Sequence, residues 1–381
     1  MSHIVVISSY PLFPLMGGNR VRTFSLIKSM KNLGHTITFI YLKPRKKEEI
    51  DLIYHQKYFN GQFLVLNRNF MYELIYLTKR YLYKILRKLT KKNHLQSSVD
   101  EIFFNNHSKK LKQFEKENNC DYVMVNYVHF SKSLLSFPNS IKIIDTHDSF
   151  ENQMPEREES LGFLRADYLI AIQEQERKKF IKQLIKLGVA KSKTNVLTIS
   201  HIIDKVEKIA QQDHFGASFI GSYFRQNNES INWFILRVLP LVVNKYPDFK
   251  IYISGSVCNA VKEDKNVVLL GRVEEVIDAF KQAPILINPI IYGTGIKIKL
   301  LEAWGLGLPV VSTQLGVKGI DQEFLAGTYV VEDLDPASFA NALIKLCEDS
   351  AVRENFSQIN FNNSEKWNNI QESTIQFLLN Q

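Results

Sequence analysis

The sequence contains little cysteine and no long apolar run. Its three cysteines, Cys120, Cys258 and Cys347, are far apart and lack CxxC spacing, so they indicate neither a disulfide framework nor a zinc site. No segment approaches the ~18 uninterrupted apolar residues of a membrane-spanning helix. The first apolar stretch, IVVI, is too short for a signal peptide and has no basic segment before it. We therefore expect a chain of the reducing cytoplasm, without a leader or a membrane span.

Short β-rich runs alternate with helix-length amphipathic segments along the 381 residues. At ~150 residues per domain, this length suffices for two hydrophobic cores. Runs that are apolar throughout are typical of parallel strands covered on both faces. The pattern predicts an α/β chain of two doubly wound, Rossmann-like domains, with strands over 3–8, 36–42, 63–66, 122–127, 142–146, 168–172 and 195–199 in the first and 218–222, 250–256, 266–271, 284–290, 309–313 and 328–331 in the second.

A change of composition near residues 200–216 predicts the domain boundary. We place the first domain at 1–203 and the second at 204–365, and we expect a C-terminal helix of about 366–381 to cross back onto the first. Two such domains facing each other form a central cleft lined by the carboxyl ends of their strands, where these sheets bind ligands. The sequence therefore predicts the binding site at these strand ends.

The stretch YGTGIKIKLLEAWGLGLPVVST, residues 292–313, is typical of a strand-to-helix connection that binds phosphate. The Gly293–Gly295 turn brings backbone N–H groups close to a ligand, and a helix beginning at Ile296 adds the partial positive charge of its N-terminus. Lys299 adds a full charge, and Glu302, on the same face, can accept hydrogen bonds from sugar hydroxyls. A solvated lysine pair and a surface glutamate are the alternative interpretation.

Five segments resemble, in the expected order, the motifs of glycosyltransferase family 4. GTGIKIKLLEAWGLGLPVVSTQLGVKGI resembles the family signature, in which a glycine-rich turn, a lysine and a helical glutamate precede a G-x-PVV strand. The others are PLFPLMGGNRVRTFSLIKSMKNLGHTITFI, IIDTHDSF, LRADYLIAIQEQERKKF and FIGSYFRQNNESINWFILRVLPLV. Because the match covers nearly the whole chain, the combination is more specific than any one segment.

The resemblance implies the GT-B fold and an enzyme, a retaining glycosyltransferase of the hexosyltransferase type. It would transfer a sugar from a UDP- or GDP-linked donor to a glycan or lipid-linked acceptor, as in polysaccharide biosynthesis, with no metal and no cofactor besides the nucleotide-sugar co-substrate. The Asp333–Asp335 segment superficially resembles a metal-binding D-x-D. However, Asp335 before Pro336 is typical of an N-cap followed by proline at the first helical position.

The resemblance also assigns roles in the second domain. Glu302 would hold the ribose hydroxyls, Lys299 would neutralise the departing diphosphate, and both would be catalytic. Backbone contacts to the base would come from Arg272 and Val273. The other donor-binding residues implied are Thr294, Gly295, Ile296, Lys297, Arg225 and Asn228.

Two positions of the second domain depart from the family's commonest pattern. Thr294 stands where many members carry a glutamate that contacts the donor sugar, which leaves recognition of the sugar open. Arg225 is only near the place of the family's usual basic residues, so Lys297 is the alternative partner for the phosphate.

In the first domain, the resemblance implicates Gly17, Gly18 and Arg22, which would approach the diphosphate or the acceptor. A flexible turn and a surface arginine are the alternative. His147 and Asp148 follow the strand KIIDT and so lie at the ligand-binding edge of their sheet. By resemblance, His147 is catalytic and contacts the donor sugar or orients the acceptor, while Asp148 contacts the sugar or merely caps a turn.

The net charge of +9 is unevenly distributed. Residues 1–200 hold 32 Lys and Arg against 18 Asp and Glu, whereas residues 201–381 hold 16 against 21. The segment 71–92 carries seven Lys or Arg and one Glu, as a helix lying on an anionic membrane does; a solvated helix packed on its own domain is the alternative. We predict peripheral contact with the inner membrane face, and no nucleic acid partner, because no nucleic-acid module is recognised.

Other functions remain open from the sequence. A GT-B nucleotide-sugar epimerase would need acid and base carboxylates that the sequence does not identify. A non-catalytic basic membrane-binding protein is opposed by the dense placement of Gly293, Gly295, Lys299 and Glu302. A dinucleotide dehydrogenase is disfavoured because neither glycine cluster continues as GxGxxG after the first strand.

Overall fold

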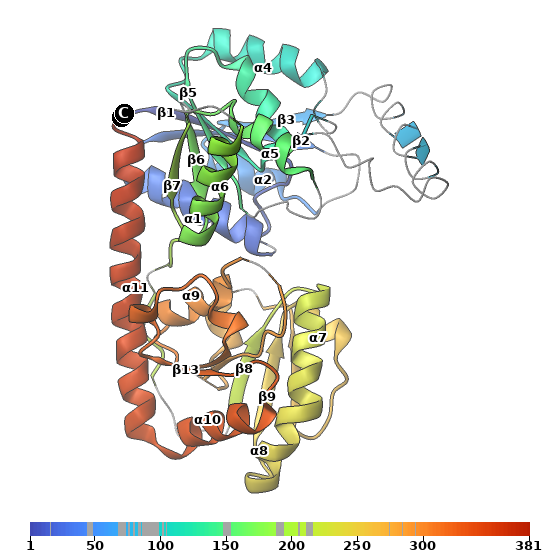
Figure 1. Cartoon of the computed structure of the whole chain (residues 1–381), viewed down its shortest axis with the longest axis vertical. Coiled ribbons are helices and arrows are strands. Elements are labelled where there is room, and N and C mark those ends of the chain that lie inside the picture. The colour runs from blue at the N-terminus through green and yellow to red at the C-terminus, as the bar shows by residue number, and fades with distance from the viewer. Residues whose placement is uncertain are drawn as a thin grey trace. The chain divides into compact units, whose positions relative to one another are not determined.

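The computed structural model of the chain contains two compact units (Figure 1). Unit 1 comprises Met1–Ser200 together with Thr374–Gln381, and unit 2 comprises His201–Ser373. The structure describes residues 1–15, 17–43, 49–67, 74, 77–78, 81–82, 85, 99–100, 103, 105–147, 154–187, 194–204, 206–210, 216–273, 275–283, 285–293 and 295–381.

Unit 1 is built around a parallel sheet with the strand order β3-β2-β1-β4-β5-β6-β7. The order reverses at β1, and doubly wound sheets bind ligands at the carboxyl ends of the strands beside such a switch point. The strands are β1 (His3–Ser8), β2 (Thr36–Lys43), β3 (Phe63–Asn67), β4 (Tyr122–Asn126), β5 (Ile141–Asp145), β6 (Tyr168–Ala171) and β7 (Asn195–Thr198).

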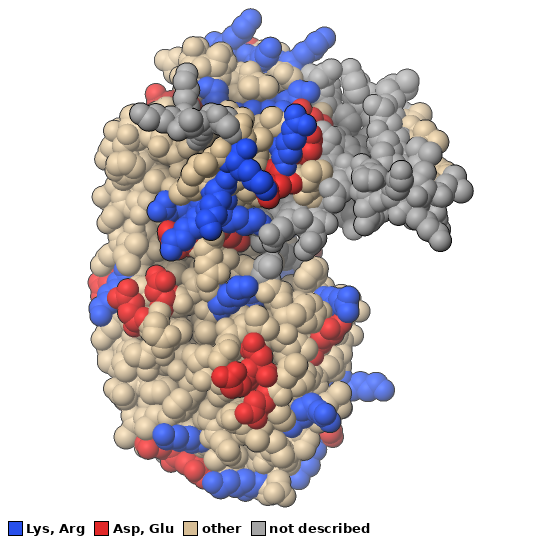
Figure 2. Space-filling view, in the orientation of Figure 1, with Lys and Arg blue, Asp and Glu red and all other residues tan. Residues whose placement is uncertain are grey.

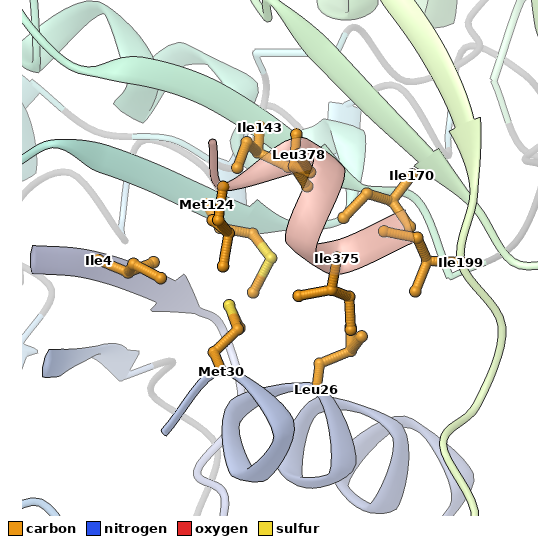
Figure 3. A pocket seen from close by; sticks show the side chains of 10 residues that line it. Ile4, Leu26, Met30, Met124, Ile143, Ile170, Ile199, Ile375 and Leu378 are labelled. Carbon is orange, nitrogen blue, oxygen red and sulfur yellow. The ribbon is translucent and has the colours of Figure 1, made fainter. Parts of the chain in front are cut away.

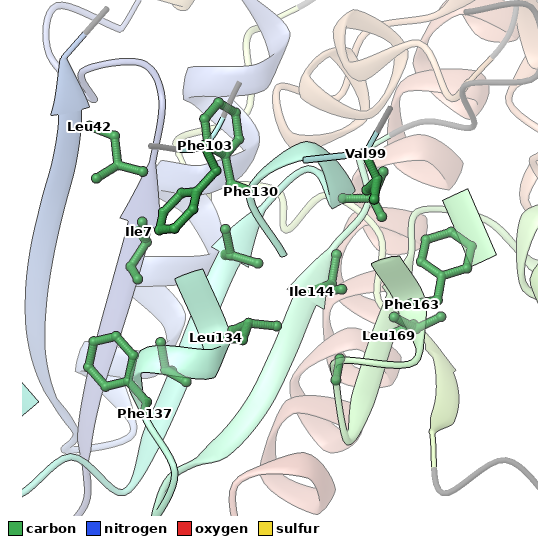
Figure 4. Close-up of a cluster of buried hydrophobic side chains, with 14 of the residues drawn as sticks. Ile7, Leu42, Val99, Phe103, Phe130, Leu134, Phe137, Ile144, Phe163 and Leu169 are labelled. Atoms are coloured by element: carbon green, nitrogen blue, oxygen red, sulfur yellow. The ribbon is translucent and has the colours of Figure 1, made fainter. Parts of the chain in front are cut away.

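Side chains of these strands alternate between two covered faces, which is why the strand sequences are apolar throughout. Val5 and Ile7 join the core cluster shown in Figure 4, whereas Ile4 between them faces the other side. The first face is covered by α4 (Asn105–Glu117), a 3₁₀ segment (Val128–Ser136), α5 (Glu156–Phe163) and α6 (Glu174–Lys186), and the second by α1 (Gly18–Asn32). A further helix, α2 (Leu52–Tyr58), precedes β3.

The last residues of the chain complete the second face of unit 1. Helix α11 (Ser350–Leu378) contributes Ile375 and Leu378, which are 2% and 3% exposed, to the lining of one small cavity together with Leu26 and Met30 of α1 (Figure 3). The cavity left among these side chains is about 10 Å³ and its lining is apolar. Because that volume is at the lower limit for a single water molecule, this contact serves packing rather than ligand binding.

Replacing Ile375 by Ala is expected to lower the free energy of unfolding of unit 1 by about 3 kcal/mol, because it removes buried apolar surface and leaves a cavity. The matched control is Phe377→Ala on the same helix, since Phe377 is 55% exposed; its effect should stay within about 0.5 kcal/mol. Denaturant unfolding of both variants, followed by hydrogen exchange in β1 and β4, measures the difference. Equal losses for the two would show that the C-terminal turn does not stabilise unit 1.

Unit 2 has a second parallel sheet, with the strand order β10-β9-β8-β11-β12-β13. Its switch point lies between β8 and β11. The strands are β8 (Gly216–Ile220), β9 (Lys250–Ser254), β10 (Val267–Gly271), β11 (Leu286–Asn288), β12 (Val310–Thr313) and β13 (Thr328–Val331), and the helices besides α11 are α7 (Arg225–Trp233), α8 (Leu239–Lys245), α9 (Ile298–Gly305) and α10 (Pro336–Glu348).

In unit 2, too, successive side chains of a strand pack into two different hydrophobic clusters. Ile287 and Val311 join the cluster with Phe339 of α10, whereas Leu286 and Val310 join the cluster with the helix α9. Every predicted strand segment overlaps an observed strand, and the predicted pair of parallel-sheet α/β domains is confirmed.

The boundary between the units lies three residues before the predicted one, and the C-terminal return begins at Thr374 instead of about residue 366. The reason is the packing of the connecting segment within unit 2. Ile203 and Trp367 belong to one hydrophobic cluster of that unit, and Trp367 Nε1 donates a hydrogen bond to the carbonyl of His201. The side chain of Asn368 also bonds both the N–H and the carbonyl of Ile203.

Asp335 is the N-cap of α10, as predicted. Its carboxylate accepts hydrogen bonds from the backbone N–H groups of Ala337 and Ser338, at 3.1 Å each, and Pro336 takes the first helical position. Asp333 accepts from the backbone N–H of Leu315 at 3.0 Å. Both aspartates of the apparent D-x-D are therefore used by backbone groups.

The segment 71–92, predicted to contact a membrane, lies largely outside the described residues. Within the described part, Lys and Arg gather over α6 (Figure 2), which carries Arg177, Lys178, Lys179, Lys182 and Lys186. Among them, Arg177 pairs with Glu174 and Lys186 with Glu156. Among the described residues, no helix combines the length and the apolar character needed to cross a bilayer.

Candidate active site

The glycine turn of unit 2 connects β11 to α9 at the carboxyl edge of the sheet. Gly293 and Gly295 have φ values of +122° and +73°, which side chains with a Cβ rarely adopt. A Cβ on Gly293 would also lie 2.1 Å from the amide nitrogen of Gln226. The helix begins at Ile298, two residues later than predicted, with Lys297 as its N-cap. Ile296 is buried in the core, so the turn is anchored directly before the helix.

Lys299 lies in the first turn of α9 and is half-buried. Its Nζ donates a hydrogen bond of 3.1 Å to Asn227 Oδ1 and lies 4.0 Å from the centre of the Phe219 ring. Burial and, to a smaller extent, the nearby charge of Lys297 lower the pKa of Lys299, Glu302 opposes part of this shift, and the resulting pKa is about 7. The amine is thus close to losing its charge, and an anionic ligand beside it would restore that charge.

Glu302, one turn further along α9, is also half-buried. Burial and, to a smaller extent, the charge of Asp204 raise its pKa, Lys299 opposes part of this shift, and the resulting pKa is about 7. Two oppositely charged groups with pKa values moved toward neutrality are typical of a functional site, although buried ion pairs that serve only structure shift in similar ways.

The structure assigns Lys297 to the turn itself. Its side chain is buried, and Nζ donates a hydrogen bond of 2.6 Å to the carbonyl of Gly295. Lys297 therefore holds the glycine turn closed and adds positive charge next to Lys299.

Asn227 is a site residue that sequence reasoning missed. It lies in the first turn of α7, where its amide nitrogen donates to the carbonyl of Ser222 while its oxygen accepts from Lys299. The predicted neighbour, Asn228, instead offers its backbone carbonyl to Asn232, and its buried side-chain oxygen has no hydrogen-bond partner among the residues that the structure describes. The run of two asparagines was the available signal, but only the helical phase of α7 decides which of them faces Lys299.

Three of the other donor-binding residues predicted for unit 2, Arg225, Arg272 and Val273, are described in the structure. Arg225 is largely exposed and donates to Glu229 four residues on, at 2.6 Å. Arg272 is exposed directly after β10, and Val273 packs against the cluster that contains α9. Thr294 is not among the described residues.

In unit 1, Gly17 precedes α1 with a φ of +83°, and its carbonyl accepts hydrogen bonds from the N–H groups of Arg20 and Val21. Gly18 is the first residue of the helix. Arg22 differs from the prediction that it approaches a ligand, because it is 1% exposed and its Nη2 donates to Asp145 Oδ1 at 2.7 Å. The guanidinium points into unit 1 because it pairs with a buried carboxylate, and local sequence patterns do not reveal such a distant partner.

His147 follows β5 at the carboxyl edge of the sheet, as predicted, and is buried. Its ring nitrogen Nε2 lies 3.0 Å from Asp145 Oδ2 and 3.1 Å from the hydroxyl oxygen of Tyr10. Asp148 falls outside the described residues. In the described part of the chain, no group of three or more His, Cys, Asp and Glu side chains is arranged to hold a metal ion.

Comparisons with known proteins agree with this architecture. The family model described as "Glycosyl transferases group 1" matches residues 215–349, which lie within unit 2. The crystal structure of TarM covers 100% of this chain, and 98% of TarM is covered, at 13% identity and a TM-score of 0.69. A structure of HepE from Anabaena, in complex with UDP and glucose, covers 100% of both chains at 11% identity and a TM-score of 0.64. The fold is GT-B.

Two curated relatives match over part of their length. An uncharacterized 44.6 kDa protein in the cps region of Klebsiella pneumoniae is 29% identical over 150 residues, 36% of this chain. An uncharacterized glycosyltransferase of Methanocaldococcus jannaschii is 24% identical over 239 residues, 50% of this chain. The chain spans 38% and 57% of the lengths of these relatives.

Proposed function

We propose that the protein is a retaining glycosyltransferase of family 4, which transfers a hexosyl group from a UDP- or GDP-linked donor to a glycan or lipid-linked acceptor without a metal. The observation that carries the proposal is the grouping of the Gly293–Gly295 turn, Lys299 and Glu302 at the start of α9. The match of residues 215–349 supports it, as do neighbours such as TarM of S. aureus, in complex with UDP and alpha-GlcNAc-glycerol.

The turn and helix have the chemistry that a departing nucleoside diphosphate needs. Negative charge builds on the phosphate as its bond to the sugar breaks, and donors fixed at that place stabilise the transition state most. The N-terminus of α9 supplies backbone N–H groups and a partial positive charge. Lys299 supplies a full positive charge on a flexible side chain. Its amine donates a hydrogen bond to Asn227, and a bound phosphate would compete for that bond.

Glu302 suits the ribose of the donor. An ionised carboxylate is acceptor-only, and its two oxygens can receive hydrogen bonds from two neighbouring hydroxyls. Glu302 is half-buried and lies one helical turn after Lys299. Its carboxylate would therefore lie farther from the phosphates than Lys299 does, which leaves it for the ribose. In unit 1, His147 is the proposed contact with the substrate, and retention of configuration is proposed from the resemblance.

The experiment is to incubate the protein with UDP-glucose, UDP-N-acetylglucosamine and GDP-mannose and to measure the nucleoside diphosphate released, with water or added glycans as acceptors. A glycosyltransferase releases UDP or GDP together with a transferred or free sugar. An epimerase would instead convert one nucleotide-sugar into its epimer with no net release. Binding of no nucleotide-sugar at millimolar concentration would exclude both enzymes and leave a non-catalytic protein.

Affinity for UDP-glucose is expected to be highest near pH 7 and to fall on both sides. Above pH 7 the free protein loses the proton of Lys299 that the bound diphosphate requires, so affinity should fall by up to about tenfold per pH unit. Below pH 7 Glu302 becomes protonated and accepts fewer hydrogen bonds. Calorimetric titrations from pH 6 to 9 measure this, because the diphosphate diester of UDP-glucose does not itself titrate there. A flat profile would contradict the role of Lys299, and Lys299→Met should remove only the alkaline fall.

We further propose, from the sequence alone, that the segment 71–92 binds the anionic inner face of the membrane. Replacing Lys84, Arg87, Lys88 and Lys91 by Glu should abolish sedimentation with vesicles that contain anionic lipid, while binding to neutral vesicles stays low for both proteins. A variant with Lys178 and Lys182 of α6 replaced by Glu is the matched control. Equal partition of the wild-type protein and the four-residue variant would end the proposal.

A further inference from the structure

Three ionisable side chains of unit 1 form a buried network at the carboxyl edge of its sheet. Arg22 comes from α1, Asp145 ends β5, and His147 follows two residues later. Arg22 Nη2 donates to Asp145 Oδ1 at 2.7 Å and to the carbonyl of Ile199 at 2.8 Å, while Asp145 Oδ2 lies 3.0 Å from His147 Nε2. Asp145 is fully buried and Arg22 nearly so. This network therefore joins α1 and the end of β7 to the ring of His147.

The geometry decides which nitrogen of His147 carries hydrogen. Although burial raises the pKa of Asp145, the guanidinium of Arg22 and the ring of His147 lower it more, so the carboxylate stays ionised and can only accept. A bare Nε2 at 3.0 Å would set two lone pairs against each other. A hydrogen on Nε2 removes this repulsion, and the acceptors within reach are Asp145 Oδ2 at 3.0 Å and the Tyr10 hydroxyl at 3.1 Å.

The Tyr10 hydroxyl is itself fixed from the other side. Asn126 Nδ2, at the end of β4, donates to it at 2.9 Å, and the hydroxyl shares a hydrogen bond of 2.8 Å with Thr23 Oγ1 of α1. The hydroxyl is thus aligned before any ligand binds. Both of these contacts of the His147 ring use Nε2, and no residue in the described part of the chain forms a hydrogen bond to Nδ1.

The backbone around this network adopts a conformation that is rare for residues other than glycine. His147 has a φ of +58°, and Tyr127, directly after β4, has a φ of +67°. Their rings lie 4.6 Å apart. Such strain persists where surrounding contacts hold it, and it concentrates at functional sites. A buried ion pair is also weak evidence for stability, since apolar residues of similar size often replace it without loss.

We propose that Asp145, clamped by Arg22, is a positioning residue that orients the His147 ring with its Nε2 hydrogen directed inward and Nδ1 left for the substrate. The inference rests on the proposed glycosyl transfer, in which His147 contacts the substrate. Arg22 then acts on the ligand only through Asp145 and His147, and Asp145 determines the tautomer of His147.

A double-mutant cycle tests the coupling. Asp145→Asn and His147→Ala are each expected to lower kcat for nucleoside diphosphate release by about 10- to 100-fold, while KM for the nucleotide-sugar changes little. The variant with both changes should be no slower than the slower single one, because Asp145 acts through His147. Effects that multiply, or an unchanged kcat in Asp145→Asn, would overturn the proposal.

Two controls separate positioning from folding. Asp100→Asn breaks another Arg–Asp pair of unit 1, in which Arg165 Nη2 donates to Asp100 Oδ2 at 2.9 Å, and should leave kcat of the folded protein unchanged. Arg22→Met combined with Asp145→Leu replaces the buried pair by apolar side chains. It should keep the melting temperature yet lose the same 10- to 100-fold in kcat, whereas full activity would show that the pair is structural.

Nitrogen NMR of the histidine rings tests the same proposal without turnover. His147, assigned by comparison with His147→Gln, should carry its hydrogen on Nε2 in the wild-type protein and lose that preference in Asp145→Asn. An unchanged ring spectrum would refute the positioning role. Titration with UDP keeps the two hypotheses apart: no binding by the wild-type protein counts against glycosyl transfer, while the ring spectrum still decides the role of Asp145.

Discussion

Lys299→Met is expected to lower kcat/KM for transfer from a UDP- or GDP-sugar by about 10²- to 10³-fold, which corresponds to about 3–4 kcal/mol of transition-state stabilisation. The reason is that Lys299 is the full charge held at the N-terminus of α9, half-buried and aligned by Asn227. In such a partly desolvated place, one charge acts more strongly than on the surface.

The same substitution should not destabilise the protein at pH 7. The pKa of Lys299 is lowered from 10.5 to about 7 in the folded state, so the unfolded chain binds more protons between these values. Stability therefore falls as pH falls from about 10.5 to 7, and methionine removes this cost. We expect Lys299→Met to melt at the same or a higher temperature than wild type at pH 7, with a smaller difference near pH 10.

Lys281→Met is the matched control for this experiment, because Lys281 is an exposed lysine of unit 2 paired with Asp278. It should keep both activity and melting temperature. If Lys299→Met retained wild-type turnover, or lost activity only together with its fold, the phosphate role of Lys299 would be wrong.

Glu302→Ala is expected to weaken UDP binding by about 10- to 100-fold, the effect of losing hydrogen bonds to a charged acceptor. A sharper result concerns the ribose itself. Wild-type protein should bind UDP more tightly than 2′-deoxy-UDP, whereas Glu302→Ala should bind both equally, because the carboxylate that detects the hydroxyl is gone.

Calorimetric titration of both nucleotides into both proteins gives this comparison in four measurements. Glu323→Ala, which removes an exposed carboxylate of the same unit, serves as the control and should keep the preference for UDP. A preference for UDP that survives in Glu302→Ala would place the ribose contact elsewhere.

The fold was predictable because its strands are continuous apolar runs. Val5 and Ile7 face one layer of helices and Ile4 the other, so strands buried on both sides leave a strong signal in the sequence. The ends of the units were less predictable. Ile203 and Trp367 are apolar residues near a boundary, and which core they join depends on the return of α11, which no local pattern encodes.

The turn and helix of the candidate site were predictable because they are local in sequence. Gly293, Lys299 and Glu302 lie within ten residues, and a turn followed by one helical turn fixes their arrangement. Arg22 and Asp145 are 123 residues apart, so their ion pair could not be anticipated. Asn227 was missed for a related reason, since its contact with Lys299 joins two different helices.

The most direct test of the central claim is a crystal structure with bound UDP or GDP. The account predicts that the diphosphate lies at the Gly293–Gly295 turn and the N-terminus of α9, with Lys299 Nζ within hydrogen-bond distance of a phosphate oxygen and released from Asn227. A nucleotide whose phosphates lie away from this helix terminus, with Lys299 still bonded to Asn227, would contradict it.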